Sequence, residues 1–381
     1  MGCQKDNRFR TEQTLSHTTI KADQSGRFGQ PAIYLLIPLL ILILSACNRD
    51  GPLTADTSIE QLSNAINSNI PGLIEKYRIT GLSVGVIRDG QLCLLRSFGR
   101  SRTSPEKRLD ENTLFRVASL GKPVFAYIVV ALAKQGLLDL DALLYPYLKE
   151  KVIDDDPRST QITARMILTH TSGLPNLGTN AGELKFHFAP GSDFNYSGHG
   201  YLYLQKVIEK LSGKGLEQLA IETVFEPLGM SNSSYVWHAD YSNHLAQSYD
   251  SKGKQYTTKS RPQSAFSAWS LFTTLPDYAR FVEHMIERSN DPDSIASTLL
   301  QSQTEVAKGV DWGLGWGLQQ TRPNSSFWHW GSMAGFKHFV VGYPKEKLAV
   351  IVMSNNERAF KITDKIMAMT IGGSYPAYDW F

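Results

Sequence analysis

The stretch 115–136 constrains the fold more than any other part of the chain. Apolar residues such as Val124 and Ile128 recur there at the spacing of one helical face. The pattern predicts a helix that opens at Ser119 and is ended by Gly136, because a glycine just after the last periodic residue is a common helix stop. We therefore expect one long, buried helix at the centre of the folded chain.

Ser119 and Lys122 lie three residues apart in this predicted helix, so their side chains should be neighbours one turn apart. A serine hydroxyl is a weak nucleophile until a base accepts its proton. A lysine can be that base if burial or a neighbouring cation lowers its pKa. The two residues are thus a candidate catalytic pair. The same spacing also occurs by chance in ordinary amphipathic helices, so the spacing alone leaves both interpretations open.

The composition indicates a globular chain with an ample core. The 381 residues suffice for one large or two ordinary domains, and 42% of them are apolar while 20% are charged. The net charge of +3 comes from 39 basic and 36 acidic residues. Because this balance is close to neutral, we expect neither a nucleic acid nor a strongly acidic partner.

The N-terminal segment has a different character. Residues 31–44 form an apolar run of signal-peptide length, which is too short for a comfortable membrane span. The following sequence, Leu-Ser-Ala-Cys at 44–47, resembles the lipobox of bacterial lipoproteins. The resemblance implies that Cys47 carries lipid and anchors the protein in the cell envelope on the periplasmic side. Asn48, in place of Asp, then favours the outer membrane; an uncleaved anchor is the alternative.

We expect three parts in the chain: a lipoprotein signal peptide over 1–46, a tether over 47–57 and one folded domain over 58–381. A hairpin early in this domain and strands at its end most simply share one antiparallel sheet flanked by helices. A mostly α-helical region over about 137–261 would then be an insertion. The α/β part would comprise about 58–136 and 262–381.

Local patterns predict the individual elements. A helix is expected over 59–77, capped by Thr57 or Ser58, and Asp89-Gly90 predicts a hairpin turn between two apolar segments. Further strands are expected over 312–320, 327–330, 336–343 and 348–353, and further helices over 137–148, 163–169, 198–211 and 360–369.

Two other kinds of site find little support. Residues 81–85 match the G-x-S-x-G nucleophile elbow, but an elbow needs a strand before the serine and a helix after it. Ser83 instead begins a predicted strand, so we do not expect it to be a nucleophile. The histidines form no H-E-x-x-H motif and pair with no closely spaced cysteines, so we expect no metal and no cofactor.

Several short stretches follow the candidate pair in a fixed order: Leu-Thr-His-Thr-Ser-Gly at 168–173, Phe-Ala-Pro-Gly at 188–191, Asn-Tyr-Ser-Gly at 195–198, Pro-Leu-Gly-Met at 227–230 and Trp-His-Trp-Gly-Ser at 328–332. With them the chain resembles the serine β-lactamase and penicillin-binding protein superfamily. Within it, the chain is most similar to the class C β-lactamase-like group of esterases and peptidases. The resemblance extends from about Ser58 to the C-terminus and implies the α/β fold of that superfamily.

The resemblance also implies roles for individual residues. Ser119 would be the acylated nucleophile and Lys122 its proton partner, while Tyr196 matches the tyrosine of the family's Y-x-N motif and would share the acid and base work. A tyrosine with its usual pKa of about 10 serves as a base only if cations or hydrogen bonds favour the phenolate, and Lys122 could provide that help. The backbone amides of Ser119 and Ser332 would form the oxyanion hole.

Two departures from the family pattern concern substrate binding. Gly198 stands where the family has an asparagine, and His329, before Trp330 and Gly331, stands where many members have the lysine of K-T-G. A mostly neutral imidazole offers less positive charge than a lysine, so His329 is a candidate substrate contact or only a hydrogen-bonding strand residue. Arg358, after the last strand, could restore carboxylate binding or could be a solvated loop residue.

The expected protein is therefore a serine hydrolase that forms an acyl-enzyme on Ser119. Small-molecule esters, amides or peptidoglycan-derived compounds in the cell envelope are the expected substrates. We take His170 as structural, because Lys122 and Tyr196 already fill the role of base. One alternative is D-Ala-D-Ala carboxypeptidase or β-lactamase activity, since both use the same acylation machinery. The other is a catalytically slow penicillin-binding or cell-wall-fragment-binding lipoprotein; the sequence leaves the oligomeric state open.

Overall fold

A computed structural model describes residues 57–178, 184–257, 261–320, 325–372 and 375–380. The proposed signal peptide, Cys47 and most of the tether lie outside these ranges. Within them, no helix combines the length and the apolar character that a membrane crossing needs.

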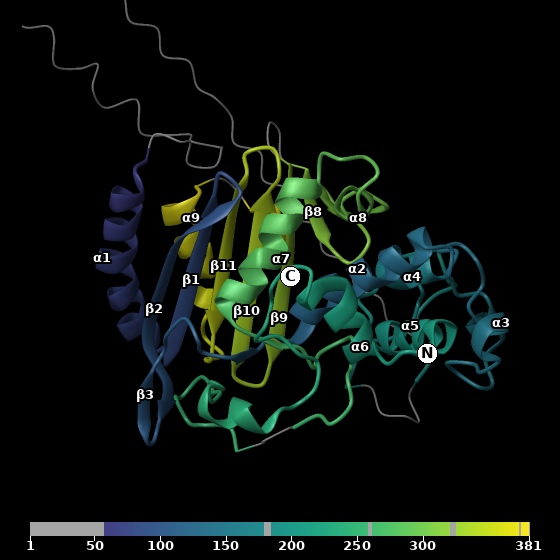
Figure 1. Ribbon diagram of the computed structural model, residues 1–381, viewed down its shortest axis with the longest axis horizontal. Helices are drawn as coiled ribbons and strands as arrows, with labels where there is room; N and C mark the ends of the chain where they lie inside the picture. The colour runs from purple at the N-terminus through teal and green to yellow at the C-terminus, as the bar shows by residue number, and fades with distance from the viewer. Residues whose placement is uncertain (1–56, 179–183, 258–260, 321–324, 373–374, 381) are drawn as a thin grey trace, which may run out of the picture. The chain divides into compact units, whose positions relative to one another are not determined.

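Nine antiparallel strands form the main sheet, in the order β3-β2-β1-β11-β10-β9-β8-β7-β6 (Figure 1). The strands are β1 (Gly81–Arg88), β2 (Gln91–Thr103), β3 (Glu106–Arg108), β6 (Thr304–Ala307), β7 (Val310–Trp312), β8 (Gly317–Gln320), β9 (Ser325–Met333), β10 (Phe336–Tyr343) and β11 (Leu348–Ser354). A two-stranded sheet pairs β4 (Phe115–Arg116) with β5 (Phe272–Thr273).

The two ends of the folded chain meet at the centre of the main sheet. There β1 pairs with β11 from Leu82 opposite Ser354 to Ile87 opposite Ala349. Strands from before and after the helical region thus share one sheet, as predicted. The observed architecture confirms the predicted fold class, an α/β fold with an antiparallel sheet, flanking helices and a mostly helical insertion.

Helices cover both faces of this sheet. On one face α1 (Ile59–Tyr77) and α9 (Phe360–Thr370) contact each other and the strands, and α7 (Leu275–Arg288) contacts the opposite face. Successive residues of a strand point to opposite faces, so Val350 packs in the cluster with α1 and α9, whereas Ile351 packs in the other cluster. Burial on both faces explains why β11 is apolar at nearly every position.

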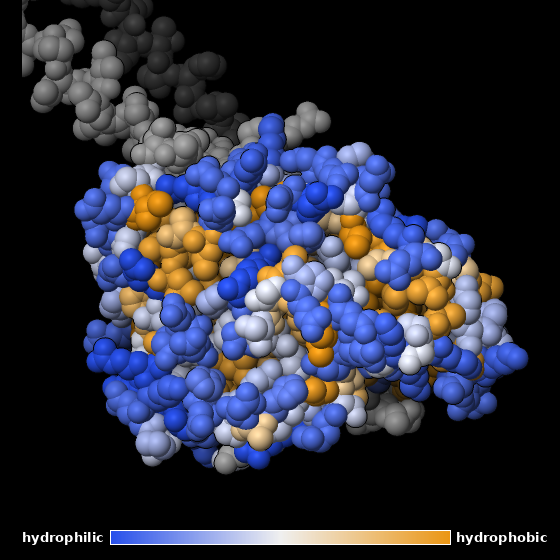
Figure 2. Space-filling model, in the orientation of Figure 1, coloured by the Kyte–Doolittle hydropathy of each residue, from blue (hydrophilic) through white to orange (hydrophobic). Residues whose placement is uncertain are grey.

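The helical region lies beside α2 (Gly121–Lys134), the buried helix expected from the sequence. Figure 2 shows a mostly hydrophilic face in this view, with hydrophobic residues gathered over β1 and around α4. The remaining helices are α3 (Tyr145–Leu148), α4 (Ala164–Leu168), α5 (Gly198–Ser212), α6 (Leu216–Ala220), α8 (Ile295–Leu299) and α10 (Pro376–Trp380), with short η turns at η1 (Ala118–Leu120), η2 (Pro157–Thr160), η4 (Ile221–Phe225) and η5 (Ala239–Asn243).

Two local expectations need correction, and one long helix was not expected. The predicted helix over 137–148 is reduced to α3, because Asp139 accepts a hydrogen bond from the amide of Asp141 and forms a turn before it. The predicted strand over 312–320 is two strands, since the chain turns between them with Gly315 at a φ of 80°. Helix α7 was not predicted, although Thr274 caps it and a proline follows near its start.

Candidate active site

Ser119 lies in η1, a single turn that leads into α2. The predicted helix start at Ser119 is two residues early, because Ser119 and Leu120 belong to this turn and α2 begins at Gly121. Ala118, the first residue of the turn, has a φ of 51°, which an α-helix does not contain. A non-glycine residue in this left-handed region is strained and needs support from its surroundings. The amide of Val117 provides some of it by donating to the carbonyl of Leu271 at 3.0 Å.

Lys122 lies in the first turn of α2 and its side chain is fully buried. Its Nζ donates to Ser119 Oγ at 3.0 Å and to the carbonyl oxygen of Ala268 at 2.9 Å. Burial lowers the pKa of Lys122 to about 7, because the charged amine loses its hydration. No carboxylate of a described residue forms an ion pair with it. The structure thus brings an amine that is neutral in a large fraction of the molecules at neutral pH into contact with the serine hydroxyl.

Tyr196 precedes α5 and its ring faces Lys122, whose Nζ lies 4.8 Å from the ring centroid. The residue is partly exposed, but its hydroxyl is buried and has no hydrogen-bond partner among the described residues. Burial raises the pKa of Tyr196 by more than the nearby Ser119 hydroxyl lowers it. The phenol is therefore neutral, and the structure does not favour the phenolate that a base role would require.

His170 positions the segment that carries Tyr196. Its Nδ1 accepts a hydrogen bond from the amide of Ser197 at 3.0 Å, and its carbonyl accepts one from the amide of Asn195 at 2.8 Å. The imidazole also lies against the Tyr196 ring, with 4.2 Å between the centroids. Burial, with a smaller contribution from Lys122, holds the pKa of His170 well below its usual value. A neutral His170 that holds the chain on both sides of Tyr196 agrees with the structural role expected from the sequence.

His329 is buried on β9, with its ring centroid 6.1 Å from that of Tyr196. Its Nδ1 bonds the carbonyl of Trp330 at 2.8 Å, which places the ring proton on Nδ1 because a carbonyl only accepts. Burial lowers the pKa of His329 to about 3, and the charge of Lys122 contributes further. His329 is therefore neutral and does not supply the positive charge of a lysine.

The far half of β9 runs directly past the Ser119 turn. Pairing between β8 and β9 ends at Trp328, and η1 contacts β9. A Cβ at Gly331 would lie 2.2 Å from the carbonyl oxygen of Val117, so a side chain does not fit between the two backbones. This approach places Ser332, the next residue of β9, at the edge beside η1. Its own hydroxyl accepts a hydrogen bond from Lys337 Nζ at 2.9 Å.

The other two substrate-binding candidates lie in different surroundings. Gly198 is buried, and its amide donates to Asn176 Oδ1 at 3.1 Å. A Cβ there would lie 2.4 Å from Leu177 Cγ, so an asparagine would require Leu177 to move. Arg358 lies between β11 and α9, and its amide donates to Asn356 Oδ1. None of the described contacts joins Arg358 to the serine, lysine and tyrosine.

Two groups beside Lys122 were not found from the sequence. The carbonyl of Ala268 carries no sequence pattern, because every residue has one. Tyr201 lies on α5, and its ring centroid is 5.5 Å from Lys122 Nζ. From the sequence alone, Tyr201 is only one more apolar position of a predicted helix. In the part of the chain that the structure describes, no group of three or more His, Cys, Asp or Glu side chains could hold a metal ion.

Solved structures with this fold define the class of protein. A class C beta-lactamase superimposes with a TM-score of 0.72 at 20% sequence identity, over 83% of this chain and 98% of that chain. The octameric penicillin-binding protein homologue from Pyrococcus abyssi gives a TM-score of 0.69 at 22% identity, over 81% and 76% of the two chains. The chain has the fold of the β-lactamases and penicillin-binding proteins.

The beta-lactamase family model matches residues 66–366, and the chain belongs to this family. Protein flp of Staphylococcus aureus (strain MW2) is 22% identical over 331 residues, which cover 77% of this chain and 64% of that protein. Penicillin-binding protein 4* of Bacillus subtilis (strain 168) is 24% identical over 332 residues, covering 74% and 69%. The chain thus spans about two thirds of the length of these relatives. These matches confirm the superfamily that the sequence motifs indicated.

Proposed function

We propose that the protein is a serine hydrolase that forms an acyl-enzyme on Ser119 and acts on ester or amide substrates of the cell envelope. The contact of 3.0 Å between Lys122 Nζ and Ser119 Oγ carries this proposal. With a lysine pKa of about 7, roughly half of the molecules hold a neutral amine at neutral pH. Such an amine can accept the serine proton without a metal or a cofactor.

The arrangement supports a complete proton path. Ser119 Oγ attacks the substrate carbonyl as its proton passes to Lys122, and the backbone amides of Ser119 and Ser332 stabilise the oxyanion. Tyr196, a neutral phenol beside both groups, donates its proton to the leaving group and regains one from Lys122. Water then attacks the acyl-enzyme and gives its proton to Lys122. Lys122 returns this proton to Ser119 Oγ as the bond to the acyl group breaks, so the acid is released and the serine hydroxyl is restored.

The surroundings of the pair favour an ester or a broad acyl substrate. His329 is neutral where the family lysine would carry charge, and Leu177 fills the space beside Gly198 where an asparagine side chain would extend. Both features weaken the recognition of β-lactams and of D-Ala-D-Ala peptides. The alternative of carboxypeptidase or β-lactamase activity draws support from the match to the beta-lactamase family model and from the similarity to a relative named penicillin-binding protein 4*. A slow binding lipoprotein is less well supported, because Ser119 and Lys122 are in contact.

Labelling with a fluorophosphonate tests the nucleophile. We expect the label on Ser119 and none in the folded Ser119→Ala variant. Ser83→Ala is the matched control, because Ser83 belongs to the G-x-S-x-G sequence but lies in β1 with its Oγ 2.8 Å from Ser97 Oγ. This variant should still be labelled. Label that persists in Ser119→Ala would refute the proposed nucleophile.

Three substrates rank the proposed activities: a short-chain 4-nitrophenyl ester, a chromogenic cephalosporin and a D-Ala-D-Ala peptide. We expect the ester to give the highest kcat/KM, and Ser119→Ala to remove its turnover. A higher kcat/KM for the cephalosporin or the peptide would favour the alternative hydrolase activity. A stable acyl-enzyme without turnover of any of the three would favour the binding lipoprotein.

We also propose that lipid on Cys47 anchors the protein on the periplasmic side of the outer membrane. The support is the apolar run over 31–44 followed by Leu-Ser-Ala-Cys, which lies outside the described residues. Cys47→Ala should abolish the incorporation of labelled fatty acid and release the protein from membrane fractions, whereas Cys93→Ala should change neither. Continued lipidation of Cys47→Ala would rule out this site.

A further inference from the structure

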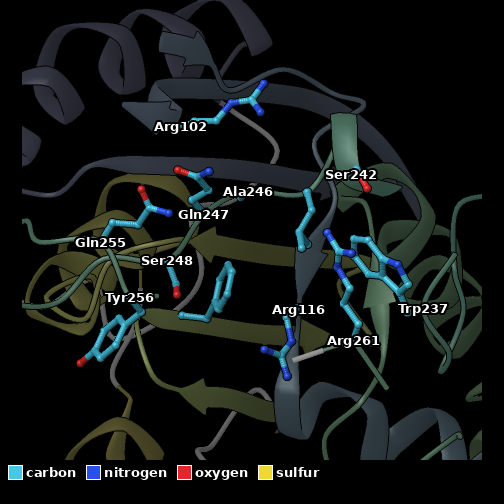
Figure 3. A pocket seen from close by; sticks show the side chains of 12 residues that line it. Arg102, Arg116, Trp237, Ser242, Ala246, Gln247, Ser248, Gln255, Tyr256 and Arg261 are labelled. Atoms are coloured by element: carbon cyan, nitrogen blue, oxygen red, sulfur yellow. The ribbon is translucent and has the colours of Figure 1, made fainter. Parts of the chain in front are cut away.

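A pocket that does not include the serine, lysine and tyrosine is lined by three arginines (Figure 3). The cavity measures about 200 Å³, which suits a small polar group with a few attached carbon atoms. Arg116 and Arg261 lie near Trp237 on one side of it, while Gln247 and Tyr256 lie on the other. Arg102 completes the basic lining, and none of the twelve lining residues is acidic.

The three arginines have no counterion in the described parts of the chain. No ion pair is recorded for Arg102, Arg116 or Arg261 there, and the Nε atoms of Arg102 and Arg116 are buried without a hydrogen-bond partner. Burial lowers the pKa of Arg116, and no acid offsets that effect. The carboxylate of Glu357, close to the pocket, instead accepts a hydrogen bond from the Tyr256 hydroxyl at 2.5 Å. Arg102 and Arg116 are partly buried and Arg261 is exposed. A buried donor without a partner is costly, so an anion from outside that accepts from the Nε atoms of Arg102 and Arg116 would stabilise the pocket.

Aromatic rings hold two of these guanidinium groups in place. The Cζ of Arg116 lies 5.9 Å from the ring centroid of Phe272, and the Cζ of Arg261 lies 4.9 Å from that of Trp237. The Phe272 and Trp237 rings are themselves 5.8 Å apart, so the two arginines belong to one continuous cluster. Stacking on a ring face leaves the N–H edges of a guanidinium free, and these edges match the two oxygens of a carboxylate or phosphate.

The pocket is built on the two segments that carry the proposed oxyanion amides. Arg116 lies three residues before Ser119, and Phe336, which also lines the pocket, lies four residues after Ser332 across the β9–β10 hairpin. A substrate bound at Ser119 could therefore extend towards the arginines. We propose that this pocket binds a carboxylate or phosphate group at one end of the substrate, so that the enzyme prefers anionic esters or amides over neutral ones. This inference rests on the proposed hydrolase function.

Two esters of matched length test the preference: mono-4-nitrophenyl glutarate, which carries a carboxylate, and neutral 4-nitrophenyl valerate. The measured quantity is the ratio of their kcat/KM values. We expect a ratio above one in the wild type and a fall of at least tenfold in Arg116→Gln and in Arg261→Gln. Arg288→Gln is the matched control, because Arg288 pairs with Asp291 outside the pocket and its loss should leave the ratio unchanged. An unchanged ratio in both pocket variants would overturn the proposal.

Calorimetric binding to the full chain carrying Ser119→Ala separates this proposal from the hydrolase proposal. Glutarate and inorganic phosphate are the two probes, and the tighter one identifies the anion. Adding Arg261→Gln should weaken binding at least tenfold. If an anion binds in this manner but the wild type hydrolyses no ester, the pocket stands and the hydrolase function fails. If esters are hydrolysed but neither anion binds, the pocket proposal fails alone.

Discussion

Lys122 Nζ, on a fully buried side chain, lies 3.0 Å from Ser119 Oγ, and this contact sets the pH dependence of the proposed reaction. Burial lowers the pKa of Lys122 to about 7, and only the neutral amine accepts the serine proton. We expect kcat/KM for a nitrophenyl ester to rise with pH through about 7 and then level off. The control is Lys122→Arg, which keeps a cation without a usable neutral form and should lose activity about 10³-fold or more. A rising limb centred above pH 9 would contradict a neutral lysine base.

The same lysine should destabilise the fold. Its pKa falls from 10.5 to about 7 on folding, so the unfolded chain binds more protons between these values and stability rises as the pH increases from 7 to 10.5. Lys122→Met removes this cost but also two hydrogen bonds, so we expect it to be more stable than the wild type by about 2 kcal/mol at pH 7. Urea unfolding at pH 7 and pH 10 measures the difference, which should shrink at the higher pH. A less stable variant at pH 7 would mean that the lysine stabilises the fold.

The sequence predicted what depends on local patterns. Ser58, one of the two expected caps, caps α1, with its Oγ accepting a hydrogen bond from the amide of Gln61. The apolar runs predicted the bounds of β10 and β11 to within one residue. The pair at Ser119 and Lys122 could be proposed because residues three apart in a helical turn are neighbours. The environment of this pair could not be predicted, because Lys122 contacts the carbonyl of Ala268, which lies 146 positions further along the chain.

The same limit explains the errors at the site. Ala118 has its positive φ in a turn that contacts β9, and no residue type in this stretch predicts that conformation. The further rise in the pKa of Tyr196 follows from burial that only the folded chain creates. The arginine pocket joins segments from 102 to 336, which share no sequence motif. Spacing thus suggested the proposed reacting groups, whereas the shifts of their pKa values and the arginine pocket required the tertiary structure.

Tyr196→Phe should separate catalysis from stability. The Tyr196 hydroxyl has no hydrogen-bond partner among the described residues, so its removal should change the free energy of unfolding by less than about 1 kcal/mol. It should lower kcat about 10²-fold to 10⁴-fold, because the leaving group loses its proton donor. Ester kinetics and thermal unfolding of the same preparation measure both. Full activity in the folded variant would remove Tyr196 from the mechanism.

His329→Gln tests whether the histidine titrates during catalysis. Burial lowers the pKa of His329 to about 3, so the wild-type imidazole is neutral from pH 5 to pH 9. We expect the variant to keep the rising limb near pH 7, whatever its effect on kcat, since that limb belongs to Lys122. A pH profile from 5 to 9 is the measurement. Loss of the limb would show that the histidine, and not the lysine, is the titrating group.

Gly331→Ala should disrupt both the fold and the site, because the added Cβ would lie 2.2 Å from the carbonyl oxygen of Val117. Backbone must move to admit it, so we expect a loss of stability of about 1–3 kcal/mol. The shift would also displace Ser332 from the Ser119 turn and lower kcat about 10²-fold or more if its amide binds the oxyanion.

The matched control is Gly72→Ala in α1, where a Cβ meets no atom within 4 Å. Alanine has the higher helix propensity, so this variant should be more stable by about 0.5–1 kcal/mol and fully active. Thermal unfolding and ester kinetics of the two variants give the comparison. If Gly331→Ala is as stable and as active as the wild type, the strand beside η1 has room for a side chain. In that case the position of Ser332 would not depend on the close approach of β9 to Val117.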